Sequence, residues 1–205
     1  MPFPDELAHG LRVGDYDPRW PQEFCSVAAC VGEALGTLAR RVDHVGSTSV
    51  PDLPAKDCID VQVQVERLDD DAIVVAFDAI GFRLRPEPWN RTEVTDGRSW
   101  PKLVFAPPAG ERAANVHVRP AGSASARRNL LFRDFLCADA GARAAWGEFK
   151  RRLAQTASDV YEYGRIKQPA TEVLMIAAED WARRTGWPDP SPPGCREPVA
   201  GSVPG

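Results

Sequence analysis

Apolar positions near the N-terminus predict an amphipathic helix. Asp17 and Pro18 supply a helix cap and a first-turn proline, and apolar residues then recur at helical spacing from Trp20 to Leu35. Gly36 follows the last of them and marks the end of the helix. We therefore expect a first helix that turns one face towards a core.

Two-residue alternation is clearest between Cys58 and Val65. The isoleucine and valines of this run fall on one face, whereas Asp60, Gln62 and Gln64 fall on the other. This pattern predicts a strand with one apolar face and one polar face.

Shorter apolar runs predict further strands and a second helix. The expected strands are Val42–Val45, Phe82–Arg85, Lys102–Ala106 and Ala114–Arg119, with the last two joined as a hairpin. An acidic start at Asp69 predicts a helix that reaches Ile80. In the final strand, Asn115, His117 and Arg119 share one face.

The second half of the chain is predicted to be helical. Helices are expected over Ser123–Ala138, Ala140–Ala157 and Pro169–Thr185, the last ending at Gly186. Because strands and helices come in blocks rather than in strict alternation, the pattern indicates an α+β fold. The segment 188–205 is rich in Pro, Gly and Ser and lacks an apolar period, which predicts a disordered tail.

Length and charge exclude several classes of protein. A chain of 205 residues fits one domain with extensions at its ends. The formal charge of −4 argues against binding to long nucleic acid, although a local basic patch can still hold a small phosphorylated ligand. No signal peptide is evident and no apolar run approaches the roughly 20 residues of a membrane span, so we expect a cytoplasmic protein with no membrane partner.

A Gly-Ser turn provides the first candidate chemistry. Gly46 follows a predicted strand, where a glycine lets the backbone approach a phosphate while successive N–H groups and the Ser47 hydroxyl surround its oxygens. Asp60, on the polar face of the next strand, could hold a divalent cation against the same phosphate. The simpler interpretation is a connecting turn and a carboxylate satisfied by backbone N–H groups.

Longer segments carry a family resemblance. They are VGDYDPRWPQEF near the N-terminus, HVGSTSVPDLPAKDCIDVQV around the turn, NVHVRP, and NLLFRDFL and YEYGRIKQP in the helical half. Through them the chain resembles the GrpB family, whose domains have a nucleotidyltransferase-like fold and also occur fused behind dephospho-CoA kinase in actinobacteria. The resemblance implies a mixed sheet packed with helices over residues 13–187, with an N-terminal arm at 1–12 and a tail at 188–205.

The resemblance also implies the plan of the active site. In the superfamily, a Gly-Ser turn binds phosphate beside two carboxylates spaced D-x-[DE], and a third carboxylate often lies on a later strand. Asp60 matches the first carboxylate, but Gln62 stands at the second, and an amide is a poorer ligand for a hard cation. This departure weighs against ordinary two-metal transfer. His117, near the third position, could join them at a single metal ion or act as an acid or base.

Basic residues supply candidate contacts to phosphate or to a substrate carboxylate. They are Lys56, Arg119, Lys150 and Lys167, and Thr48 belongs to the phosphate turn itself. Lys150 lies in the run Lys150-Arg151-Arg152, and such a run is usually a solvated helix face.

These features predict a nucleotide-dependent transferase. It would use ATP or another nucleoside triphosphate with Mg²⁺ to transfer a nucleotidyl or phosphoryl group, or to activate an acceptor for amide formation. Its expected partners are the nucleotide and a small acceptor. Two alternatives stay open. One is a non-catalytic nucleotide-binding or CoA-binding module, and the other is a metal-independent enzyme that uses the pocket for a small carboxylate or amine.

Overall fold

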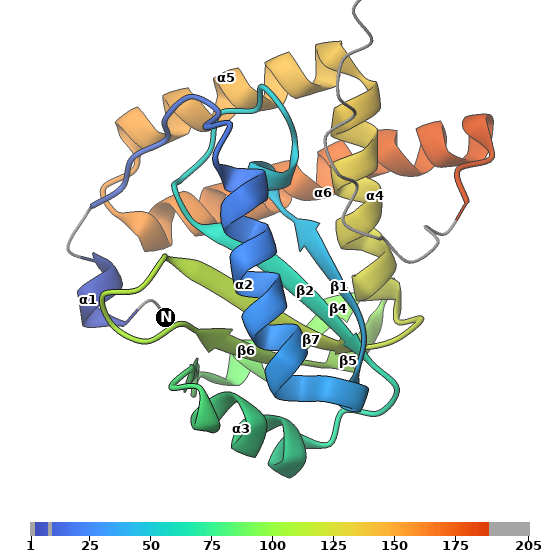
Figure 1. The fold of residues 1–205 in the computed structure, drawn as a ribbon. Helices are drawn as coiled ribbons and strands as arrows, with labels where there is room; N and C mark the ends of the chain where they lie inside the picture. The colour runs from blue at the N-terminus through green and yellow to red at the C-terminus, as the bar shows by residue number, and fades with distance from the viewer. Residues whose placement is uncertain (1–2, 8–9, 189–205) are drawn as a thin grey trace, which may run out of the picture.

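A mixed β-sheet forms the centre of the described chain, which comprises residues 3–7 and 10–188 of the computed structural model (Figure 1). Its five strands are ordered β1 (Ala39–Val45), β2 (Ile59–Val65), β7 (Ala114–Pro120), β6 (Leu103–Ala106) and β3 (Arg83–Leu84). β2 and β7 are parallel, whereas the β1–β2, β6–β7 and β3–β6 pairs are antiparallel. The expected α+β class, the mixed sheet and the β6–β7 hairpin are confirmed.

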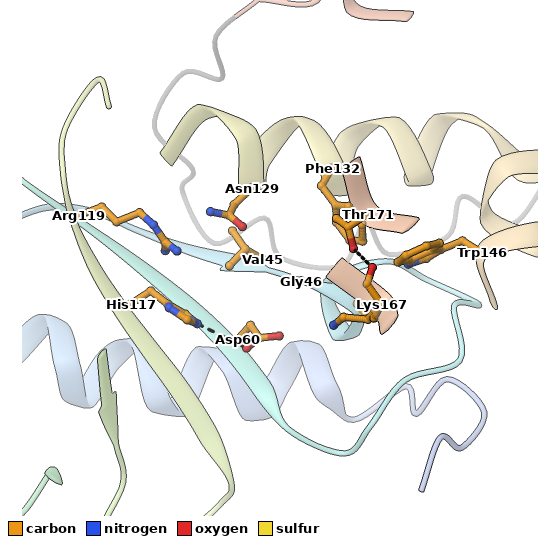
Figure 2. A pocket seen from close by; sticks show the side chains of 11 residues that line it. Val45, Gly46, Asp60, His117, Arg119, Asn129, Phe132, Trp146, Lys167 and Thr171 are labelled. Atoms are coloured by element: carbon orange, nitrogen blue, oxygen red, sulfur yellow. Dashed lines mark hydrogen bonds and ion pairs between the residues drawn. The ribbon is translucent and has the colours of Figure 1, made fainter. Parts of the chain in front are cut away.

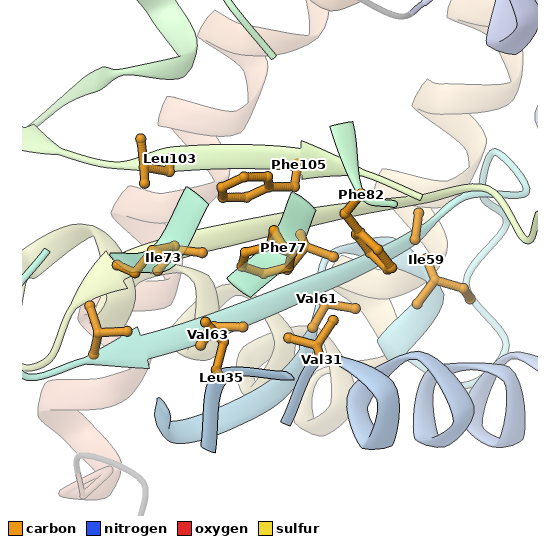
Figure 3. Close-up of a cluster of buried hydrophobic side chains, with 14 of the residues drawn as sticks. Val31, Leu35, Ile59, Val61, Val63, Ile73, Phe77, Phe82, Leu103 and Phe105 are labelled. Carbon is orange, nitrogen blue, oxygen red and sulfur yellow. The ribbon is translucent and has the colours of Figure 1, made fainter. Parts of the chain in front are cut away.

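The apolar face of the sheet is covered by α2 (Trp20–Leu35) and α3 (Asp70–Ala79). Figure 3 shows Val61 and Val63 of β2 packed with Val31 of α2 and Phe77 of α3, and all four residues are fully buried. Asp69 caps α3 by accepting a hydrogen bond from the backbone N–H of Ala72. The valine alternation in β2 therefore faces the core, as its period predicts.

The opposite face of the sheet carries polar side chains on two neighbouring strands. The parallel register pairs Asp60 with Asn115, Gln62 with His117, and Gln64 with Arg119. Because paired residues of neighbouring strands point to the same side, these groups form one polar surface. α4 (Ala124–Ala138) lies against it, and the Gln62 side chain donates a 3.1 Å hydrogen bond to the Ala126 carbonyl.

α4, α5 (Ala140–Thr156) and α6 (Val160–Thr185) form the helical half of the molecule. They pack around a second apolar cluster that includes Leu131, Trp146 and Met175. Val50 and Leu53, from the loop between β1 and β2, are fully buried in the same cluster. This loop therefore links the sheet to the helices.

The helix expected from Pro169 begins instead at Val160. Asp159 caps it by accepting hydrogen bonds from the backbone N–H groups of Tyr161 and Glu162. Pro169 removes one hydrogen bond inside the helix, but packing of α6 against α4 and α5 keeps the helix continuous.

A hairpin absent from the expected elements lies between β3 and β6. It consists of β4 (Thr92–Thr95) and β5 (Arg98–Pro101), joined by Asp96 and Gly97 with φ values of 54° and 70°. Asp-Gly is a strong signal for a two-residue hairpin turn, because both turn residues need a positive φ. Short 3₁₀ turns complete the described chain at η1 (Gly36–Leu38), η2 (Ser47–Ser49) and η3 (Pro88–Asn90).

The expected N-terminal arm contains the short helix α1 (Pro4–Leu7). Asp5 and Glu6 form ion pairs with Arg83 and Arg85 near the β3 edge of the sheet. The tail expected over residues 188–205 lies outside the described residues except for Pro188. In the part of the chain that the structure describes, no helix is both long and apolar enough to cross a membrane.

Candidate functional site

The Gly-Ser turn packs against Asp60, the carboxylate that the sequence pattern places beside it. Gly46 follows β1 and has φ 71° and ψ −166°, a conformation that is essentially restricted to glycine. A Cβ atom at this position would lie 2.4 Å from Asp60 Oδ2 and 2.9 Å from Asp60 Cβ. The glycine therefore allows the turn and Asp60 to share one small region.

The hydroxyl groups after Gly46 have different surroundings. Ser49 Oγ donates a 2.6 Å hydrogen bond to the Gly46 carbonyl, which closes the turn. Thr48 is buried, and its hydroxyl lies 3.0 Å from His44 Nε2, whose ring stacks on Phe24. Ser47 is the hydroxyl of this turn that lines a pocket. The structure thus gives Thr48 a contact within the fold.

Asp60 is held by polar neighbours on β7. Asn115 Nδ2 donates to Asp60 Oδ1 at 3.2 Å, and His117 Nε2 lies 3.8 Å from the same oxygen. Burial raises the pKa of Asp60, but the contacts with His117 and Asn115 and the charge of Lys167 outweigh it and lower this pKa. Asp60 is therefore ionised at neutral pH and can bind a cation.

His117 lines the same pocket on the β7 side. Burial and the nearby charge of Arg119 lower the pKa of His117, although Asp60 opposes this. Its Nδ1 atom is buried and has no hydrogen-bond partner within the described residues. A neutral imidazole in this place can offer one ring nitrogen to a ligand, a metal ion or a proton.

Gln62, the expected second ligand position, is fully buried and does not line the pocket in the described structure. Its Oε1 atom accepts from Arg119 and from Asn129, each at 3.4 Å. Arg119 also pairs with Glu93 through a 2.6 Å bond from Nε. The amide of Gln62 therefore has structural partners at both of its polar atoms.

Glu93 belongs to the hairpin that is absent from the expected elements. Burial raises the pKa of Glu93, but the hydrogen bond and charge of Arg119 and the charge of Lys102 lower it to about 2. The side chain of Arg119 is only 4% exposed, so this carboxylate balances a buried charge. Arg119 still lines the pocket.

Lys150 reaches the phosphate turn from α5. It is 2% exposed, and its Nζ donates to Ser47 Oγ at 2.9 Å and to the Pro54 carbonyl. Burial and the charge of Lys167 lower the pKa of Lys150 to about 7. The lysine is therefore directed at the turn and is not part of a solvated helix face.

Lys56 and Lys167 both contact the aromatic ring of Tyr163. The Nζ atom of Lys167 lies 5.7 Å from the ring centroid, and that of Lys56 lies 5.8 Å from it. Lys167 lines the pocket, whereas Lys56 is not among the described residues that line it. Burial and the charge of Lys56 lower the pKa of Lys167.

These groups surround a pocket of about 200 Å³ between the sheet and the helical half. Figure 2 shows Asp60 and His117 on the strands, with Asn129 and Phe132 of α4 and Lys167 and Thr171 of α6 across the pocket. The sequence patterns do not select the α4 residues, Thr171 or Glu93 as site residues. The helical spacing of Asn129 and Phe132 is an available signal, since residues three apart share a helix face.

Asp60 is the one carboxylate among the described residues that line the pocket. In the same part of the chain, no group of three or more His, Cys, Asp and Glu side chains is placed to hold a metal ion. Asp60 and His117 offer two donors, and Mg²⁺ commonly takes one or two carboxylates and completes its shell with substrate phosphates and water. The donor set thus fits a single cation that a phosphorylated ligand brings with it.

Comparisons with known proteins place the chain in a family. The family described as GrpB protein matches residues 10–176. A "UPF0157 protein" from Halalkalibacterium halodurans is 34% identical, with 82% of each chain covered. A protein named dephospho-CoA kinase from Mycolicibacterium paratuberculosis is 36% identical over 86% of this chain and 48% of its own length. The chain thus spans about half the length of the kinases it matches.

Solved structures share the fold. The crystal structure of GrpB from Enterococcus faecalis aligns with a TM-score of 0.69 and 25% identity, covering 83% of this chain and 99% of that chain. Cid1 poly(U) polymerase bound to MgGTP aligns with a TM-score of 0.50 and 11% identity, over 71% of this chain and 45% of that one. The second likeness concerns the fold alone, which is nucleotidyltransferase-like.

Proposed function

Because the chain belongs to the GrpB family and shares the nucleotidyltransferase-like fold, we propose that it is a nucleotide-dependent transferase acting in the cytoplasm. Its substrates would be ATP or another nucleoside triphosphate, with Mg²⁺, and a small acceptor. The reaction would move a nucleotidyl or phosphoryl group, or activate the acceptor for amide formation.

The observation that supports this proposal most strongly is the convergence of Gly46, Ser47, Asp60 and Lys167 on one pocket. A glycine turn and a lysine suit phosphate oxygens, whereas an ionised carboxylate would repel them unless a cation lay between. A phosphorylated ligand that carries its own divalent ion satisfies all of these groups together.

Each residue has a role that follows from its position. The turn at Ser47 and the ammonium of Lys167 bind phosphate, while Arg119 supplies further positive charge to the pocket wall. Asp60 would hold Mg²⁺, with His117 beside it. When bound, the ion would neutralise charge on the phosphates. Neutral His117 can accept a proton from an acceptor group as it reacts.

The test is ligand-dependent stabilisation followed by product analysis. We expect nucleoside triphosphate at about 100 times its Kd to raise the free energy of unfolding by about 2.7 kcal/mol, and to require Mg²⁺ for this effect. Asp60→Ala should remove the Mg²⁺ requirement or the binding, whereas Asp71→Ala, at an exposed residue of α3, should change neither. Mass spectrometry with pooled small metabolites would reveal pyrophosphate, ADP and adducts. If no triphosphate binds or turns over, the proposal fails.

A second candidate function is a nucleotide-binding or CoA-binding module without catalysis. The observation that favours it is Gln62, whose amide stands at a position where transferases place a carboxylate and is occupied by Arg119 and Asn129. Such a module should be stabilised by its ligand equally with and without Mg²⁺. A strict requirement for the metal ion would exclude it.

A further inference from the structure

The position of Lys150 beside Ser47 differs from that of a lysine that only binds phosphate. A lysine that only attracts phosphate would lie in the pocket wall, as Lys167 does. Lys150 instead lies behind Ser47, outside the set of described pocket residues, and its Nζ lies 2.9 Å from Ser47 Oγ. The hydroxyl thus separates the amine from the pocket.

The amine is oriented by the backbone. Lys150 Nζ also donates to the Pro54 carbonyl. This second hydrogen bond holds the amine in one orientation relative to Ser47. Pro54 itself packs against α5, since a Cβ on Gly147 would lie 2.9 Å from Pro54 Cδ. When Lys150 is neutral, its lone pair can accept the Ser47 O–H across the same 2.9 Å, which is the arrangement of a nucleophile and its base.

The surroundings of Lys150 favour a neutral amine at moderate pH. Burial is the main cause, and the charges of Lys167 on α6 and Arg151 on α5 act in the same direction. Asp60 on β2 opposes them. With a pKa lowered to about 7, Lys150 has an appreciable neutral fraction that can accept a proton.

We propose that Ser47 is a nucleophile that attacks phosphorus in the bound phosphoanhydride, with Lys150 as its general base. The Ser47 hydroxyl proton passes to Lys150 Nζ as a bond forms between Oγ and phosphorus. The bond from phosphorus to the departing oxygen of pyrophosphate or of the nucleoside diphosphate breaks, and that group leaves with the electron pair. A nucleophilic acceptor then attacks phosphorus and displaces Ser47, and Lys150 returns the proton to Oγ, which restores the hydroxyl and the neutral amine.

Phosphorus is the expected electrophile because two basic side chains line the pocket that Ser47 faces. Lys167 and Arg119 line that space and stabilise the extra negative charge of a phosphoryl transition state. The identity of the natural substrate, a nucleoside triphosphate, rests on the proposed function. Its chemistry can be tested without a nucleotide, because an activated serine also reacts with small organophosphorus electrophiles.

The experiment uses the full chain and a small fluorophosphonate. Attack by Ser47 forms a P–O bond and releases fluoride, and peptide mass spectrometry locates the adduct. We expect selective labelling of Ser47, with a rate that rises through about pH 7 and then levels off, because the neutral form of Lys150 is the base. If the wild-type protein shows no label on Ser47, or a labelling rate that does not change with pH, the proposal is wrong.

Variants separate the base from a merely structural lysine. Lys150→Arg keeps the charge and hydrogen-bonding capacity but has no accessible neutral form, so labelling should fall by about 100-fold or more. Arg152→Lys, an exposed change on the same helix, should label as the wild type does. Thermal unfolding and circular dichroism establish which variants are folded. Lys150→Arg that is folded and labels at the wild-type rate contradicts the role of Lys150.

Failure of this inference and failure of the proposed function give different results. If triphosphate binds with Mg²⁺ and turns over while Ser47 stays unlabelled, the transferase stands and the serine nucleophile is wrong. If Ser47 is labelled in a Lys150-dependent manner but no nucleotide binds, the nucleophile stands and the nucleotide substrate is wrong. Incubation with ATP labelled in its α-phosphate or its γ-phosphate then shows which group Ser47 retains.

Discussion

The backbone of Gly46 combines φ 71° with ψ −166°, and its α-carbon faces the Asp60 carboxylate. Two separate restrictions therefore act on one residue. The dihedral angles disfavour any side chain, and the space in which a Cβ would stand is already filled. Gly122 has the same φ of 71° but nothing within 4 Å of the corresponding position, so the two restrictions can be separated.

Gly46→Ala should lower the free energy of unfolding by about 1–3 kcal/mol and displace Asp60, because both strain and overlap result. Gly122→Ala should show backbone strain alone, about 1–2 kcal/mol, with no change in ligand binding. Urea denaturation measures the stability, and triphosphate titration measures the binding. Equal binding losses in the two variants would show that the approach to Asp60 has no special importance.

The site residues that could be predicted from the sequence are those revealed by strand alternation or by helical spacing. Strand alternation places Asp60, and the same rule on a second strand places His117 and Arg119. Lys150 is ambiguous within a basic run, although its spacing from Trp146 and Leu153 puts it on the apolar face of α5. Glu93 cannot be found this way, since nothing local links a short hairpin to Arg119 on β7.

At the scale of elements, a glycine at the contact between α5 and the loop before β2 allows the two to pack closely. Gly147 is buried in α5, and its close approach to Pro54 leaves no room for a methyl group. Gly164 lies in α6 with nothing within 4 Å of its own Cβ position. α5 thus carries Lys150 to Ser47 because a small residue lets this helix come close to the loop.

Gly147→Ala should destabilise the protein by about 1–3 kcal/mol, because a methyl group pushes α5 away from Pro54. Gly164→Ala, in an open helical position, should be neutral or stabilising by up to about 1 kcal/mol. Thermal unfolding checks both signs, and the labelling rate of Ser47 should fall with Gly147→Ala alone. If both substitutions stabilised the protein, α5 would tolerate a larger distance from Pro54, and the close contact at Gly147 would not be required.

Sequence patterns locate most elements but not all of their limits. α2, β2 and α3 follow from a clear period and from helix-start signals. The predicted start of α6 is wrong because Pro169 is a strong local breaker that tertiary packing overrides. The Asp96-Gly97 turn is a readable signal for the β4–β5 hairpin, but its strands are too short and polar to stand out by hydrophobicity.

At the scale of the whole molecule, the pocket lies between the polar face of the sheet and the apolar cluster of the helical half. The ion pair between Glu93 and Arg119 connects the β4–β5 hairpin to β7 of the sheet. The carboxylate is ionised in the fold at pH values where an exposed glutamate takes up a proton, since its pKa is lowered to about 2 from 4.5. Its contribution to stability is therefore complete above pH 4.5 and is lost as the pH falls towards 2.

Glu93→Gln should lower the free energy of unfolding at neutral pH, by on the order of 3 kcal/mol, because Arg119 loses its counter-charge. The variant should also lose less stability than the wild type between pH 4.5 and pH 2, which denaturant titrations across that range would measure. Glu148→Gln, in an exposed ion pair, should leave the pH dependence unchanged. Parallel curves for Glu93→Gln and the wild type would contradict the assignment.

The bonding of Gln62 has a consequence for redesign of the site. A carboxylate introduced at that position would face Arg119, which already pairs with Glu93, so two anions would compete for one guanidinium. It would also lose the donor that the amide gives to the Ala126 carbonyl. Gln62→Glu alone therefore does not supply a second metal ligand: a coordinated set of substitutions is needed, because the neighbours of Gln62 depend on a neutral side chain.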